Sequence, residues 1–120
     1  MSPRKTRTAE EKVKLALSAI EDRKGLDTMT LDVRGKTPMT DYFIVTTGTS
    51  RVQIKAIVDR IIEVFADKGM KNKRVEGQDE RVWVLVDYGD VIIHVFAPEQ
   101  RRYYNLESFW MGSEAISPSL

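Results

Sequence analysis

The chain has 120 residues and a formal net charge of +1, with 42% hydrophobic and 31% charged residues. That length fits one compact domain, and that composition is typical of a globular protein, which argues against a disordered or fibrous one. The absence of cysteine excludes disulfides, thiolate metal sites and thiol catalysis. No apolar run approaches the ~20 residues that cross a bilayer, and the basic N-terminus lacks the apolar stretch of a secretory signal, so we expect a cytoplasmic protein without membrane contact.

The charges are unevenly distributed along the chain. Residues 1–74 contain 16 Lys and Arg against 10 Asp and Glu, whereas residues 75–120 contain 3 against 8. An acidic second half is better suited to a basic protein partner than to phosphate binding. A fold that interleaves the two halves would cancel the asymmetry, and the sequence leaves both outcomes open.

The first predicted element is a helix after Thr8. Thr8 and Glu11 have the spacing of a capping box, in which each side chain accepts a hydrogen bond from the other residue's amide. Apolar residues then follow the i, i+3, i+4, i+7 spacing of an amphipathic helix, and Gly25 is the expected stop. These apolar residues are Val13, Ala16, Leu17 and Ile20. Residues 27–33 alternate between apolar and polar side chains and therefore predict a strand.

A second strand is predicted at residues 42–46, followed by a strong helix after Gly48-Thr49-Ser50. Ser50 and Gln53 have capping-box spacing, and Gly69 is the expected end of the helix. The predicted buried stripe of this helix consists of Ile54, Ile57, Val58, Ile61 and Phe65. A short strand is predicted at residues 74–76.

Residues 81–87 and 91–96 predict two antiparallel strands joined as a hairpin. A two-residue turn at 88–89 would place Asp87 opposite Asp90. The same register pairs Leu85 with Ile92 and Trp83 with His94. Like charges directly opposite one another are unfavourable, so another interaction should compensate for this register.

Because side chains alternate across a sheet, the hairpin has two faces. One face is entirely β-branched and is expected in the core: Val82, Val84, Val86, Val91, Ile93 and Val95. The other is a mixed face of large apolar groups, two acids and an imidazole: Trp83, Leu85, Asp87, Asp90, Ile92, His94 and Phe96. A catalytic acid–base pair, a purely structural hairpin and a docking surface are all compatible with the mixed face. We favour docking, because no nucleophile or second histidine accompanies the acids and interface hot spots are enriched in Trp.

Pro98 is expected in the first turn of a C-terminal helix, on which Tyr103, Leu106 and Trp110 share one face. That face either covers the mixed face or extends it. Residues 1–8 and 112–120 are predicted to be flexible tails, which leaves one domain at 9–111. Alternating helices and strands predict an α/β fold, with a mixed β-sheet of about five strands flanked by helices.

Catalytic signals are weak. Gly48-Thr49-Ser50 at a helix start could bind an anion through free amides, but it lacks the spacing of a Walker loop or a dinucleotide fingerprint. Nucleotidyl transfer through two metals would require paired acids just after this turn. Arg51-Val52 stands there instead, and the next acid is Asp59. We therefore expect no enzyme, no cofactor and no metal.

Several segments resemble the ribosomal silencing factor (Iojap) family, in order and with compatible spacing from about Ala9 to Trp110. They are Leu31-Asp32-Val33, TDYFIVTTGTS at 40–50, Glu76-Gly77, WVLVDYGD at 83–90, HVF at 94–96, and RYYNLE at 102–107 with Trp110. The resemblance implies a nucleotidyltransferase-like α/β fold without catalytic residues.

The resemblance also implies a function. Family members bind protein fourteen of the large ribosomal subunit (uL14), block association of the large and small subunits, and repress translation under nutrient limitation. Relatives in organelles act in ribosome assembly, so a large-subunit biogenesis factor is an alternative, as is a residual nucleotidyltransferase. A homodimer formed through the Trp83 face, and a peripheral contact of the basic first half with ribosomal RNA, also stay open.

The residues that would contact the ribosomal protein follow from matching positions in the family, and the mixed face of the hairpin adds Leu85. The predicted partner-binding residues are Trp83, Leu85, Asp87, Tyr88, Asp90, Arg102, Tyr103, Tyr104, Leu106 and Glu107.

Overall fold

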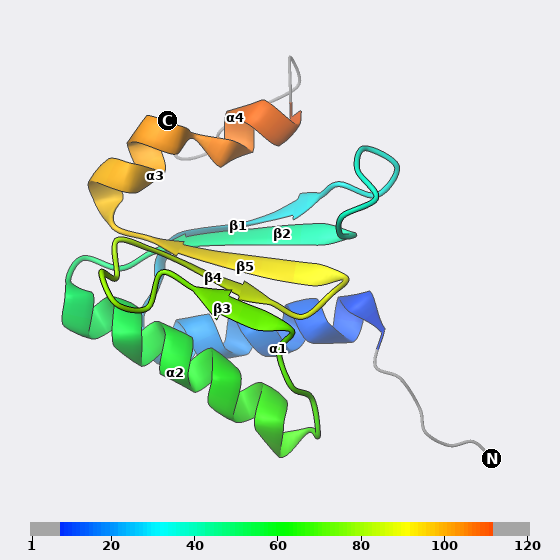
Figure 1. Ribbon diagram of the computed structural model, residues 1–120, viewed down its shortest axis with the longest axis horizontal. Helices are drawn as coiled ribbons and strands as arrows, with labels where there is room; N and C mark the ends of the chain where they lie inside the picture. Colours follow the sequence, from blue (N-terminus) through cyan, green and yellow to red (C-terminus); the bar gives the residue numbers. More distant parts are fainter. Residues whose placement is uncertain (1–7, 112–120) are drawn as a thin grey trace.

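Five strands form one mixed sheet in the order β1-β2-β5-β4-β3 (Figure 1). The computed structural model describes residues 8–111. The strands are β1 (Leu26–Asp32), β2 (Tyr42–Thr47), β3 (Arg74–Glu76), β4 (Trp83–Asp87) and β5 (Val91–Phe96). Only β2 and β5 run parallel, and the other three neighbouring pairs are antiparallel. The predicted α/β fold with a mixed five-stranded sheet is confirmed, and the strand boundaries agree within two residues.

Helices lie on both sides of the sheet (Figure 1). They are α1 (Ala9–Asp22), α2 (Arg51–Asp67), α3 (Pro98–Tyr104) and α4 (Leu106–Met111). Figure 1 shows α1 and α2 against one face, and α3 and α4 on the opposite side. Of the predicted tails, residues 1–7 and 112–120 lie outside the described residues. Among residues 8–111, no helix is long and apolar enough to cross a membrane.

The larger core fills the space between the sheet and helices α1 and α2. The predicted stripe of α2, from Ile54 to Phe65, is fully buried there. The β-branched face of the hairpin meets it, and its buried members are Val84, Val86, Val91, Ile93 and Val95. A second, smaller core lies on the opposite face of the sheet and consists of Leu31, Val33, Phe43, Val45, Ile92 and Phe96. The two helix layers thus bury the two faces of one sheet.

Both long helices begin with side-chain caps. At α1 the capping box is complete, since Thr8 Oγ1 accepts from the Glu11 amide (3.1 Å) and Glu11 Oε1 accepts from the Thr8 amide (3.0 Å). At α2, Ser50 Oγ accepts from the Gln53 amide (3.0 Å), but Gln53 Oε1 accepts from the Thr49 amide (2.7 Å) instead of the Ser50 amide. The predicted second capping box is therefore only half formed.

The β4–β5 hairpin is shifted by two residues from the predicted register. Trp83 pairs with Phe96, and Asp87 pairs with Ile92. The Tyr88 amide donates to the Val91 carbonyl (2.9 Å), so the turn residues are Gly89 and Asp90. Gly89 has a φ of 91°, and a two-residue turn with positive φ at its first position favours glycine there. The prediction that Asp87 faces Asp90 is wrong, although a shift of two residues leaves Trp83, Leu85 and Asp87 on the same face.

The C-terminal segment forms two helices instead of one. Asn105 adopts a left-handed conformation (φ 47°, ψ 54°) between α3 and α4, which Asn tolerates better than most residues. Leu106 and Trp110 pack against the second core, so this segment covers part of the mixed face. Tyr103 is 81% exposed and does not share their face, which corrects the prediction of one helical face for all three residues.

Both edge strands are short or irregular. β3, at one edge, has only three residues and carries Arg74 and Glu76. β1, at the other edge, loses its regular pairing with β2 between Leu26 and Met29, and Asp27 there has a positive φ of 50°. Such a bulge interrupts the row of free amide and carbonyl groups at a sheet edge.

Candidate functional site

Trp83 is a half-buried aromatic residue at the start of β4, and its ring is fixed from several sides. Its indole Nε1 donates to Nδ1 of His94 at 2.9 Å. The ring centroid lies 5.0 Å from that of Phe96 and 4.5 Å from that of Tyr104. A side chain held this way loses little conformational entropy on binding. The Trp83 ring is therefore held in one orientation before any partner is present.

His94 supports Trp83 and is unsuited to proton transfer at neutral pH. The side chain is only 4% exposed, on β5, and burial lowers the pKa of His94 to about 4. Because Nδ1 accepts the Trp83 hydrogen bond, the proton of the neutral ring is on Nε2, which has no partner within residues 8–111. The ring also lies 5.2 Å from Phe43 and is stacked near Phe96. His94 is a packing residue that orients an indole.

The two acids of the hairpin are held separately. Asp87 accepts from the Gly89 amide at 2.7 Å and from Nε of Arg74 at 3.3 Å. Asp90 accepts from Nζ of Lys12, on α1, at 2.7 Å. Each carboxylate therefore has a cation of its own, and the two do not face each other across the hairpin.

Two predicted contact residues lie in the interior. Tyr88 is 4% exposed and stacks on Phe65 of α2 at 3.9 Å, on the side of the sheet opposite Trp83. Glu107 is also buried, and its Oε2 accepts from Nε of Arg101 at 2.9 Å. Nη1 of Arg101 in turn donates to Oγ1 of Thr47 (3.0 Å). This buried ion pair joins the end of β2 to both C-terminal helices.

Of the remaining predicted residues, Leu106 packs against the second core, and the others lie on two neighbouring surfaces. The first, called the Trp83 surface, consists of half-buried Trp83 and Leu85 with Tyr104, which is 47% exposed. The second is the outer surface of α3 and α4, which carries exposed Arg102, Tyr103 and Phe109. The Tyr103 and Tyr104 rings meet edge to face at 5.0 Å, so the two surfaces adjoin.

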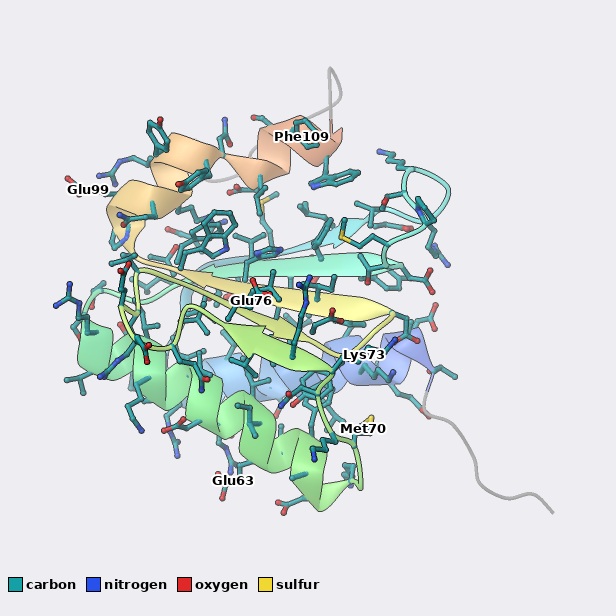
Figure 2. All side chains as sticks on the ribbon, viewed as in Figure 1. Glu63, Met70, Lys73, Glu76, Glu99 and Phe109 are labelled. Atoms are coloured by element: carbon teal, nitrogen blue, oxygen red, sulfur yellow. The ribbon has the colours of Figure 1, made fainter. Side chains whose placement is uncertain are left out.

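Phe109 was missed by sequence reasoning. Figure 2 shows it on the outer side of α4, and it is 72% exposed. The neighbouring Trp110 packs against the second core. Phe109 and Trp110 are adjacent, and on a helix covered on one side only, two such large neighbours point in directions about 100° apart, so this aromatic pair was the available signal.

Two amides of the Gly48-Thr49-Ser50 turn already have acceptors within the fold. The Gly48 amide donates to the Phe96 carbonyl (2.9 Å), and the Thr49 amide donates to Gln53 (2.7 Å). Within the described part of the chain, no group of three or more His, Asp or Glu residues is arranged to hold a metal ion. A mixed α/β domain with a preformed aromatic surface has the features of a protein-binding module.

The chain belongs to the family described as "Ribosomal silencing factor during starvation", whose model matches residues 6–119. The ribosomal silencing factor of Bacillus subtilis is 42% identical over 98 residues, which cover 82% of this chain and 83% of that protein. The chloroplastic Iojap protein of Arabidopsis thaliana is 41% identical over 106 residues, covering 87% of this chain and 43% of that protein. A crystal structure of a Chromobacterium violaceum protein matches with a TM-score of 0.86 at 37% identity, over 93% of each chain. The family resemblance in the sequence is confirmed.

Proposed function

We propose that this protein binds the large ribosomal subunit through its protein fourteen, prevents joining with the small subunit and thereby lowers translation when nutrients are scarce. The observation that carries the proposal is the preformed Trp83 surface in a chain of the ribosomal silencing family. A domain bound on the joining face excludes the other subunit sterically, so the mechanism needs no chemistry.

The contact residues we propose are Trp83, Leu85 and Tyr104, with Arg102 and Tyr103 on the adjoining surface. Large aromatic residues surrounded by polar groups account for most of the binding energy at typical interfaces. The Trp83 ring presents its apolar area without a buried polar group to satisfy, because its Nε1 already donates to His94. Burial of this area is favourable by ~25 cal/mol per Å² before the costs of association.

Tyr88 and Glu107 have a different role in this proposal. Both lie beneath the surface, Tyr88 against α2 and Glu107 in the ion pair with Arg101. Tyr88 and Glu107 stabilise the elements that carry the Trp83 surface. The partner contacts the exposed residues of that surface and not these two.

The experiment is sedimentation of purified ribosomal subunits with and without the protein, at magnesium concentrations that join them. The protein should travel with the large subunit, and joined ribosomes should disappear. Trp83→Ala should weaken binding by roughly 2 kcal/mol, which is about thirtyfold in Kd. The control is Val52→Ala, which removes an exposed apolar side chain on α2, across the sheet, and should bind like the wild type.

Circular dichroism and urea unfolding establish that Trp83→Ala is folded before binding is compared. Tyr104→Ala is a second variant, because Tyr104 is 47% exposed and belongs to neither core. A protein that stays at the top of the gradient while subunits join normally would overturn the proposal. Binding to the large subunit without loss of joined ribosomes would refute steric exclusion and favour a role in subunit assembly.

A further inference from the structure

A hollow of about 460 Å³ opens beside the Trp83 surface, between α3 and the loop that connects β3 to β4. Trp83 and Tyr104 supply aromatic walls, and Gln100 of α3 lines the same space. Asp79 and Glu80, from the connecting loop, line its remaining side. The hollow therefore combines aromatic rings with two carboxylates, although it lies outside the two cores.

The charge in this hollow is uncompensated. Asp79 and Glu80 are both exposed, and neither makes a hydrogen bond or ion pair with any residue in the 8–111 segment. None of the residues that line the hollow is basic. The acids of the hairpin differ, since Asp87 and Asp90 each contact a cation. The negative potential at the hollow is thus available to a partner.

The loop that carries the two acids is held in place against Trp83. The Gly77 carbonyl accepts from the Arg81 amide (3.0 Å), which closes the loop. Gly77 has a φ of 85°, and a Cβ there would lie 2.0 Å from the Trp83 carbonyl oxygen. Only glycine permits this close approach of the loop to β4. The backbone that carries the two acids is therefore held next to Trp83 before a partner binds.

We propose that this hollow accepts a basic side chain, an arginine or a lysine, of the protein to which the Trp83 surface docks. Aromatic walls attract a cation through their π-electrons, and carboxylates form charge-assisted hydrogen bonds with it. A guanidinium fits both features, since it is planar and offers several donors at once. The inference rests on the proposed function, because it identifies the chemistry of the partner at the same surface.

The test compares two double variants with the same change in charge. Asp79→Asn/Glu80→Gln neutralises the two carboxylates at the edge of the hollow, called its rim, and keeps the size of both side chains. Glu21→Gln/Asp67→Asn is the matched control, because both residues are exposed on α1 and α2 and make no ion pair within the described chain. Dissociation constants for purified large subunits are measured at low and high salt.

Neutralising the rim should weaken binding about tenfold at low salt, and the difference should shrink at high salt, because rim charges are screened. The control should differ little from the wild type at either salt concentration. Equal binding by both double variants, while wild type binds and Trp83→Ala does not, would overturn the inference and leave the proposed function intact. Tighter binding by the rim variant would also overturn it, since the rim would then face phosphates of ribosomal RNA. Failure of the wild type to bind the large subunit would refute the proposed function itself.

Discussion

Lowering the pH from 7 to 4 should destabilise the fold through His94. An unfolded chain protonates its histidine near pH 6.5, whereas burial lowers the pKa of His94 in the folded protein to about 4. Between these values the unfolded state binds a proton that the folded state does not bind, so stability falls as the pH falls. Below about pH 4 both states are protonated, and this loss levels off.

The magnitude follows from the difference between the two pKa values. Each unit corresponds to about 1.4 kcal/mol, so the loss is about 2 kcal/mol at pH 5 and about 3 kcal/mol at pH 4. Screening by solvent is small because the side chain is only 4% exposed. Total stabilities of small domains are roughly 5–15 kcal/mol, so a loss of this size is easily measured.

The assay is urea unfolding at a series of pH values between 7 and 4, for the wild type and His94→Asn. The Asn side-chain oxygen can accept from Trp83 much as Nδ1 of His94 does, but it does not titrate. The variant should be less stable than the wild type at pH 7, because Asn fills less of the core than His. Between pH 7 and pH 4 the wild type should lose about 3 kcal/mol of unfolding free energy relative to the variant. Asp32, whose pKa is lowered to about 2 by Arg34, affects both proteins equally and cancels. Parallel pH profiles of the two proteins would refute the reasoning.

Two further predictions concern stability and are measured by urea unfolding at pH 7. Gly77→Ala should cost at least about 3 kcal/mol, because it combines a positive φ with a clash against the Trp83 backbone, whereas Gly35→Ala, which has only the positive φ, should cost about 1–2 kcal/mol. Similar losses for both would contradict the clash. Glu107→Ala should cost about 3–5 kcal/mol, since it leaves the Arg101 charge buried without a counterion, and replacing both partners with leucine should recover most of that loss. A double variant no more stable than Glu107→Ala would disagree with this account.

Periodicity predicted the elements and their faces, but it could not determine the hairpin register. The stripe of α2 was correct because its five members, from Ile54 to Phe65, follow the helical repeat. The faces of the paired residues were also correct, since a shift of two residues leaves the alternation unchanged. Asp90, expected on the mixed face, instead lies in the turn and contacts Lys12 of α1. The register itself depends on which turn position Gly89 takes, and both positions are compatible with the same pattern.

The candidate site was predicted in part. The place of Trp83 on the mixed face was predicted, but the burial of Glu107 was not. In a continuous helix, Arg101 and Glu107 are six residues apart and point in different directions. The left-handed Asn105 between α3 and α4 brings them together, and a single Asn in a helical pattern gives little warning of such a break. The ion pair is thus a product of tertiary structure.

The two edge strands of the sheet should limit aggregation of this protein at high concentration. A three-residue β3 with charged side chains and a bulged β1 give another chain no long, flat row of amides and carbonyls to continue. Encounters between copies, or with nascent chains emerging from ribosomes, should therefore seldom lead to strand exchange or fibrillar stacking. Contacts with other chains should therefore be made through side chains. A protein with such edges can accumulate with little tendency to aggregate.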